Sequence, residues 1–293
     1  SCEDRTGYYI MEFRRIEESI FRALMILSLV FVVGSLLFVV GVILWRGLPV
    51  LSFDMITKTG EGGYLLGKGG GILNAIVGSL YLAAGGTILA FFLSIAIAFY
   101  LQKEYSGGTR LSGLTRLSLD ILWGTPSIVY GAFGYIILIY FHIRASLLGG
   151  IIVLALLEIP IMTRAMEEVL KMVPGDLKET AYSLGATRFE TTLKVVGKQA
   201  LPGLLTGVLM AFGRGIGDAA SILFTAGYTD RIPGSLFDAT ASLPIAIFSQ
   251  LSTPLPQVQQ KAYASAVILL IIVLVISIIT RLLAKKYTRF IIK

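Results

Sequence analysis

An arginine and an aspartate lie together in a long apolar stretch of the sequence. Arg214 and Asp218 are four residues apart in segment 204–226, which carries no other charged side chain. Residues at this spacing share one face of a helix and can pair. Charges at membrane depth usually face a bundle interior or a water path. The pair is therefore either an ion pair that holds packed helices together or a positively charged group beside the path of an anion. We favour the second interpretation, with Asp218 partly neutralising Arg214.

Two hydroxyl side chains flank a proline in another apolar segment. Thr125 and Ser127 stand on either side of Pro126 within segment 119–141. A proline at membrane depth frees backbone groups, which protein or water must then satisfy. We therefore expect a kink here, and we expect both hydroxyls to line the same path as Arg214.

Glu158 is a third polar feature, two residues before Pro160. Three roles are open to it: a protonated acid, a partner of Arg164 across a bend, or a path-lining group. We interpret it as structural. The sequence contains no paired catalytic carboxylates, metal-ligand cluster or nucleophile–base set. This absence disfavours an intramembrane enzyme, and we expect no cofactor.

The composition requires a membrane around these residues. Of 293 residues, 55% are hydrophobic and 15% charged, whereas about a quarter are charged in soluble domains. This excludes an ordinary soluble enzyme, a disordered chain and a secreted disulfide scaffold. Six stretches are long enough to cross a hydrocarbon core of about 30 Å. They are 21–45, 71–101, 119–141, 147–169, 204–226 and 262–284. We predict an all-α polytopic membrane protein with six transmembrane helices.

The distribution of positive charge predicts the orientation. Most of the 25 lysines and arginines fall on one side if both termini are cytoplasmic. Residues 1–20 then form a cytoplasmic tail, in which Met11 offers an alternative start, and 285–293 form a basic cytoplasmic C-terminus. Residues 46–70 form an extracytoplasmic Gly-rich loop. The net charge of +7 does not imply nucleic-acid binding.

Part of the Gly-rich loop nearly matches a phosphate-binding P-loop. Residues 62–69 read GGYLLGKG, with Gly69 where a P-loop needs a serine or threonine to hold magnesium. A flexible loop is the better interpretation. Any ATP-driven movement therefore requires an ATPase on another chain.

The segment 174–202 is too polar to cross the membrane but has a regular pattern. Asp176 and Glu179 mark the start of a first helix, and Gly185 marks its end. Thr187 followed by Glu190 predicts a second start with a capping box.

Each of these two helices carries an apolar stripe. The stripes are Leu177, Ala181 and Leu184 on the first, and Phe189, Leu193 and Val196 on the second. The unit is either an interfacial hairpin lying on lipid or a docking element for a cytosolic partner. The physical pattern alone leaves both open.

Five stretches carry a family resemblance. They are GGIL at 70–73, TPSIVYG at 125–131, the ETA at 179–181 with Gly185, ALPGLLTG at 200–207 and LFTAG at 223–227. In this order they resemble phosphate-transport permeases of the PstA type, within the type I ABC importers that carry an EAA loop. The resemblance covers about residues 21–290. The sequence differs at Thr180, where the family usually has alanine, at Gly197-Lys198, where it has Leu-Pro, and at Asp218, where it has glutamate.

The resemblance implies a MetI-like fold with a five-helix core at 71–284. It implies a partner permease of the PstC type, ATPase subunits seated on segment 174–202 and an extracytoplasmic phosphate-binding protein. The chain itself would be a non-catalytic subunit in the cell membrane that forms half of the phosphate pathway. The residues that we expect to contact the ATPase are Glu179, Ala181, Gly185, Thr187 and Phe189.

Two other functions remain open. One is a permease of the same architecture for phosphonate, sulfate, molybdate or tungstate. The other is a secondary transporter or channel that works alone, although the sequence shows no internal repeat of the kind that many such carriers have.

Overall fold

The chain is helical throughout its regular elements. The computed structural model describes all residues except 1–2, 61–69, 103–104, 106–107 and 289–293. The elements are α1 (Glu3–Gly47), η1 (Leu48–Val50), α2 (Phe53–Thr57), α3 (Leu73–Tyr100), α5 (Arg110–Gly124), α6 (Ser127–Tyr140), α7 (Leu147–Lys171), α8 (Gly175–Ser183), α9 (Arg188–Glu190), the π-helical η4 (Thr191–Val196), α10 (Gly197–Ile216), α11 (Leu243–Leu251) and α12 (Pro256–Thr288). The Gly-rich stretch 62–69 lies outside the described residues.

Five helices are long and apolar enough to cross a membrane, and the bent pair α5–α6 makes six if it counts as one crossing. The predictions of membrane helices at 71–101, 147–169 and 262–284 are confirmed by α3, α7 and α12. The predicted helix at 21–45 is the apolar part of α1. That helix also includes residues 3–20, which we expected as a polar tail.

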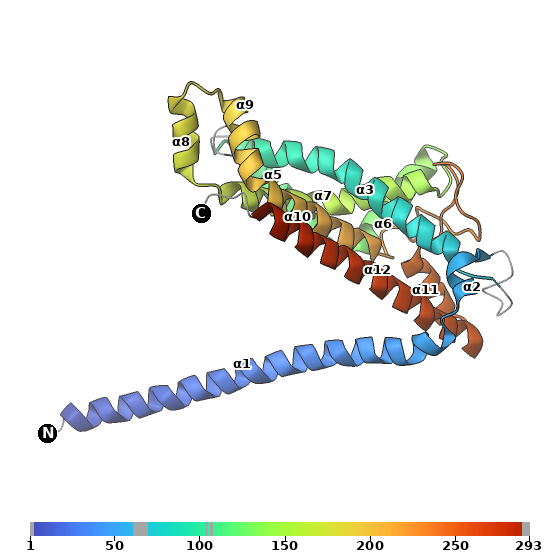
Figure 1. Cartoon of the computed structure of the whole chain (residues 1–293), viewed down its shortest axis with the longest axis horizontal. Helices are drawn as coiled ribbons and strands as arrows, with labels where there is room; N and C mark the ends of the chain where they lie inside the picture. Colours follow the sequence, from blue (N-terminus) through green and yellow to red (C-terminus); the bar gives the residue numbers. More distant parts are fainter. Residues whose placement is uncertain (1–2, 61–69, 103–104, 106–107, 289–293) are drawn as a thin grey trace.

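α1 stands apart from the rest of the molecule. The C-terminal end of α1 meets α12, and the two helices lie farther apart toward the N-terminus of α1 (Figure 1). Arg46 marks this junction, because its guanidinium lies 5.3 Å from the ring centroid of Tyr263 on α12. The large apolar side chains of α1 between residues 20 and 39 are exposed, so lipid or another protein must cover them.

The core lies between α3, α7 and α10. Ala90 of α3, Met162 and Met166 of α7 and Ala211 of α10 are fully buried within it. α7 is the most enclosed of the long helices. Small residues let these backbones approach, as where Gly86 of α3 lies against Leu154 of α7.

The kink predicted at Pro126 within 119–141 is confirmed, and it is a sharp break between two helices. α5 and α6 are separated at Thr125 and Pro126 and bent by 102°. Pro126 has no N–H and disfavours helical geometry at Thr125, whose backbone is extended. The 14 residues of α6 rise about 21 Å, short of the roughly 30 Å hydrocarbon core.

The predicted crossing at 204–226 is shifted toward the N-terminus. Helical structure runs from Arg188 through α9, η4 and α10 and ends at Ile216, and residues 217–227 form turns and irregular backbone. The helix therefore includes the second half of the patterned segment 174–202. Glycines at 213, 215 and 217 lower helix propensity at this end.

The helical hairpin formed by α8 and α9 projects from one end of the molecule. The N-terminal end of α1 and the C-terminal end of α12 point to that same end, whereas α2 and α11 lie at the opposite end (Figure 1). The hairpin and these two helix ends thus lie at the same end of the molecule, and their location on the cytoplasmic side of a membrane stays a prediction.

Candidate functional site

Arg214 and Asp218 form the ion pair that their spacing predicts. Nη1 of Arg214 lies 3.4 Å from Oδ1 of Asp218. The two do not share a helix face, because α10 ends at Ile216 and Asp218 lies in the turn beyond it. The Asp218 side chain is 4% exposed and the Arg214 side chain 49% exposed. A buried carboxylate thus holds an arginine that is still half open to its surroundings.

Asp218 is anchored independently of Arg214. Its Oδ2 accepts a hydrogen bond from the backbone N–H of Ser221 at 2.8 Å, and its own N–H donates to the carbonyl of Gly215 at 3.1 Å. This explains why the helix stops here: a short acidic side chain satisfies backbone donors in a turn. Arg214 has five N–H donors in a planar fork, and the long contact with Asp218 leaves donors available for an anion.

Thr125 and Ser127 are half-buried at the bend between α5 and α6. The Thr125 hydroxyl donates to the carbonyl of Ile121 at 2.8 Å, back onto the last turn of α5. The start of α6 nevertheless lies beside the turn that holds Asp218, because a side chain at Gly131 would collide with the carbonyl of Ser221. The structure brings the bend and the charged turn into one neighbourhood without a contact between Thr125 and Arg214.

The predicted limits of the α8–α9 hairpin are confirmed. Gly185 follows α8 with φ of +83°, and the N–H of Ala186 donates to the carbonyl of Ala181 at 3.1 Å. Such a left-handed residue closes a helix and favours glycine. Thr187 and Glu190 form both bonds of the capping box.

The apolar stripes of the hairpin are only partly buried. Ala181 is buried against the rest of the chain, as Leu177 is in part. Leu184 is 84% exposed and Phe189 66% exposed, so the hairpin does not bury the part of each stripe that lies at its tip. Leu193 is exposed as well, whereas Val196 is buried. No segment of the described chain covers this apolar tip.

Comparison with known proteins identifies the family. The family model of binding-protein-dependent transport system inner-membrane components matches residues 90–289.

This chain belongs to that family.

It is therefore a multi-pass inner-membrane permease component. The chain is similar to the phosphate transport system permease protein PstA of Haemophilus influenzae, with 30% identity over 92% of this chain and 94% of that protein. It is 33% identical to the PstA of Yersinia pestis over 96% and 97% of the two chains.

Among solved structures, a chain of the inward-facing MetNI methionine ABC transporter matches with a TM-score of 0.59 and 18% identity. The match covers 73% of this chain and 95% of that one. The likeness shows that the permease has the MetI-like fold of ABC importers.

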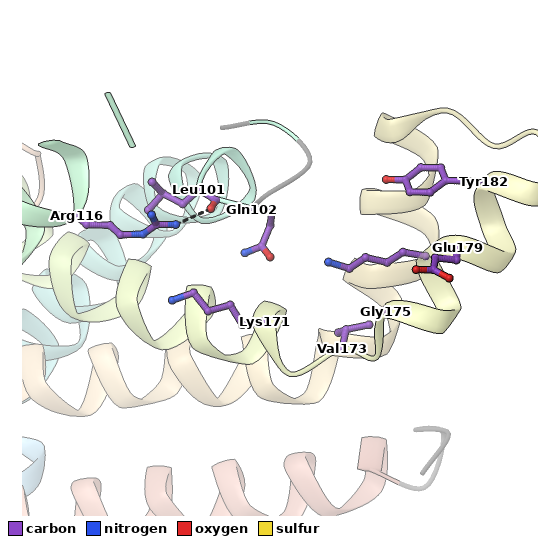
Figure 2. A pocket seen from close by; sticks show the side chains of 9 residues that line it. Leu101, Gln102, Arg116, Lys171, Val173, Gly175, Glu179 and Tyr182 are labelled. Atoms are coloured by element: carbon purple, nitrogen blue, oxygen red, sulfur yellow. Dashed lines mark hydrogen bonds between the residues drawn. The ribbon is translucent and has the colours of Figure 1, made fainter. Parts of the chain in front are cut away.

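A cavity of about 690 Å³ lies between the permease helices and α8. Its lining comes from the ends of α3 and α7, from α5 and from α8. Figure 2 shows Tyr182 of α8 on one side of this space and Lys171 and Arg116 on the other. The hairpin is thus joined to the bundle at its base and separated from it farther out.

A buried carboxylate forms ion pairs with residues of the helices next to this cavity. Glu167 of α7 is fully buried and contacts Arg116 of α5 at 2.8 Å, Arg164 at 3.0 Å and Lys171 at 3.1 Å. Arg164 also pairs with Asp120 of α5. Sequence reasoning missed this cluster, although the spacing of Arg164 and Glu167 by three residues was a visible signal. The predicted option of a pair between Glu158 and Arg164 is wrong, because Arg164 is engaged here.

Proposed function

We propose that this chain is the membrane-spanning permease subunit of an ATP-driven phosphate importer and forms half of its translocation pathway. The observation that carries the proposal is the identity of 30–33% with proteins named PstA over more than nine tenths of the chain. The half-exposed guanidinium of Arg214 supports an anionic substrate. Substrates of this kind need a cation that attracts them without trapping them.

Arg214 meets this requirement because of its arrangement with Asp218. A guanidinium recognises phosphate oxygens with two parallel hydrogen bonds. Asp218 offsets part of the charge through a contact of 3.4 Å, so the attraction is moderate. Thr125 and Ser127, at the bend beside this turn, contribute hydroxyls to the same path. The site would therefore attract phosphate only weakly and would allow it to continue along the path.

The α8–α9 hairpin is the proposed contact with a separate ATPase. Leu184 and Phe189 present apolar side chains at its tip, which a groove on the ATPase would bury. Gly185 ends α8 and Thr187 caps the start of α9. Glu179 and Ala181 lie on α8, the first toward the cavity lining and the second toward the bundle. ATP binding by the partner would move the hairpin and, through α10, the segment that carries Arg214.

The complex would contain further subunits. We propose a second permease of the PstC type, two ATPase subunits and an extracytoplasmic phosphate-binding protein. Both termini and the hairpin would then be cytoplasmic. The exposed face of α1 would meet membrane lipid and the second permease.

The test is phosphate uptake by the complex purified from its native membrane and placed in liposomes. Arg214→Gln should abolish uptake while the complex still assembles. Arg144→Gln, at an exposed loop arginine, is the matched control and should transport normally. Wild-type uptake by Arg214→Gln would contradict the proposed pathway.

Two further outcomes separate the alternatives. Competition by sulfate, phosphonate, molybdate or tungstate as strong as competition by phosphate itself would assign another oxyanion. Uptake by liposomes that contain this chain alone, driven by an ion gradient, would identify a secondary transporter.

A further inference from the structure

Glu158 is a fully buried acid in the middle of α7. Among the described residues, neither of its carboxylate oxygens has a hydrogen-bond partner. The hydroxyl of Thr87 on α3 lies beside it but does not meet the geometry of a hydrogen bond. A carboxylate ion buried without a cation or hydrogen bonds is strongly disfavoured. In this conformation Glu158 therefore keeps its proton, unlike an acid that locks two helices through an ion pair.

Gly215 of α10 provides the space for this carboxyl group. A Cβ atom at Gly215 would collide with Oε1 of Glu158, so any other residue would displace the acid. Gly215 follows Arg214 directly, and consecutive Cα atoms are about 3.8 Å apart. The Glu158 carboxyl group therefore lies within one arginine side-chain length of the Arg214 backbone.

Asp218 can release Arg214 at low cost. The Nη1–Oδ1 distance of 3.4 Å exceeds the roughly 2.7–2.9 Å of strong charge-assisted hydrogen bonds. The other oxygen of Asp218 stays bonded to the N–H of Ser221. Asp218 thus keeps a hydrogen-bond donor when Arg214 departs.

We propose that Glu158 is a second, conditional counter-ion of Arg214. When α10 shifts on α7 and water enters the path, the O–H bond of Glu158 breaks and the proton passes to that water. The carboxylate then takes the guanidinium from Asp218. This withdraws positive charge from an anion in the path and releases the anion. The proposal rests on the proposed role of Arg214 in transport.

Other charged groups on the surrounding helices do not compete for Glu158. α3 and α6 carry no charged side chain. On α5, Asp120 pairs with Arg164 and Arg116 pairs with Glu167. Among the described residues near the C-terminal end of α10, Arg214 and Asp218 are the charged groups that remain. Arg214 is thus the cation that lies within reach of Glu158.

The first test uses Glu158→Gln in the liposome-reconstituted complex. Glutamine matches the shape of the neutral acid and cannot ionise, so the fold should survive. We expect phosphate uptake to slow by about tenfold or more with unchanged assembly. Glu158→Leu should slow it similarly. Glu168→Gln, an exposed acid on the same helix, is the control and should transport at the wild-type rate. Wild-type uptake by Glu158→Gln would overturn the proposal.

The second test is independent of how the variants fold. Infrared difference spectra compare the resting wild-type complex with the complex trapped by ATP and vanadate. We expect loss of a protonated carboxylic acid carbonyl band and gain of a carboxylate band, with both changes absent in Glu158→Gln and present in Glu168→Gln. A wild-type spectrum without these changes would overturn the proposal. Normal uptake by Arg214→Gln would instead overturn the proposed function, so the two failures are distinguishable.

Discussion

The fully buried carboxylate of Glu167 accepts a hydrogen bond from Nε of Arg116 at 2.8 Å and thereby joins α7 to α5. The same arginine donates to the carbonyl of Leu101 at the end of α3 at 2.8 Å (Figure 2). Three membrane helices thus meet at one guanidinium, at the level where α7 leads into α8. We therefore expect a movement of the hairpin that is transmitted along α7 to act on α5 as well.

Glu167→Gln should destabilise the permease, because the remaining amide leaves Arg116, Arg164 and Lys171 without their shared counter-charge. We expect a loss of about 1–3 kcal/mol, measured as a lower midpoint of thermal unfolding of the detergent-solubilised complex. Glu168→Gln is the matched control. Glu168 is exposed and pairs only with Lys171 among the described residues, so its removal should cost less than about 1 kcal/mol. Equal midpoints for both variants would contradict a structural role of the Glu167 cluster.

Phe189→Ser should weaken ATPase association without unfolding the permease. The side chain is 66% exposed, so its removal takes little from the fold but removes an apolar contact with a partner. The measurement is the amount of ATPase that co-purifies with the permease. Phe237→Ser is the control, because Phe237 is 68% exposed but lies outside the hairpin. The role of the tip would be refuted by equal ATPase recovery from both variants.

Gly185→Ala should loosen the hairpin, because an alanine at φ of +83° is strained by about 1–2 kcal/mol. Limited proteolysis between α8 and α9 should become faster, and ATP-driven uptake should become slower. Gly175→Ala is the control: Gly175 has open space around it and lies in the first turn of α8, where alanine favours the helix. Faster cleavage in the control than in Gly185→Ala would contradict this explanation.

Thr187→Ala should act in the same direction through the capping box. Thr187 Oγ1 accepts the N–H of Glu190 at 3.3 Å, and Glu190 bonds back to the N–H of Thr187 at 3.2 Å. Loss of such a cap costs about 0.5–2 kcal/mol, whereas Thr187→Ser should retain the bond. Proteolysis rates of the two variants provide the comparison, and identical rates would show that the cap does not hold the hairpin.

Asp218→Asn should tighten phosphate binding and slow turnover. The amide oxygen can still accept the N–H of Ser221, so the turn remains, but the negative charge that offsets Arg214 is lost. We expect a lower KM for phosphate together with a lower maximal rate, measured as initial uptake over a range of phosphate concentrations. A raised KM would mean that Asp218 orients Arg214 rather than neutralising it.

Local patterns in the sequence determined the membrane helices and the hairpin. Apolar length alone predicts α3, α7 and α12, because a membrane requires a continuous apolar helix. The hairpin limits followed from Gly185 and from the Thr187 cap, since such signals act over three or four residues. The pairing of Arg214 with Asp218 likewise followed from proximity in the chain.

Only the tertiary structure determined which residues from distant segments of the chain contact one another. Arg116 and Glu167 are 51 residues apart in the chain, and no local signal connects them. The surroundings of Glu158 likewise depend on Gly215 of another helix, which leaves space for its carboxyl group. Hydropathy measures the transfer of each residue into an apolar medium, whereas contacts between distant segments arise only when the helices pack.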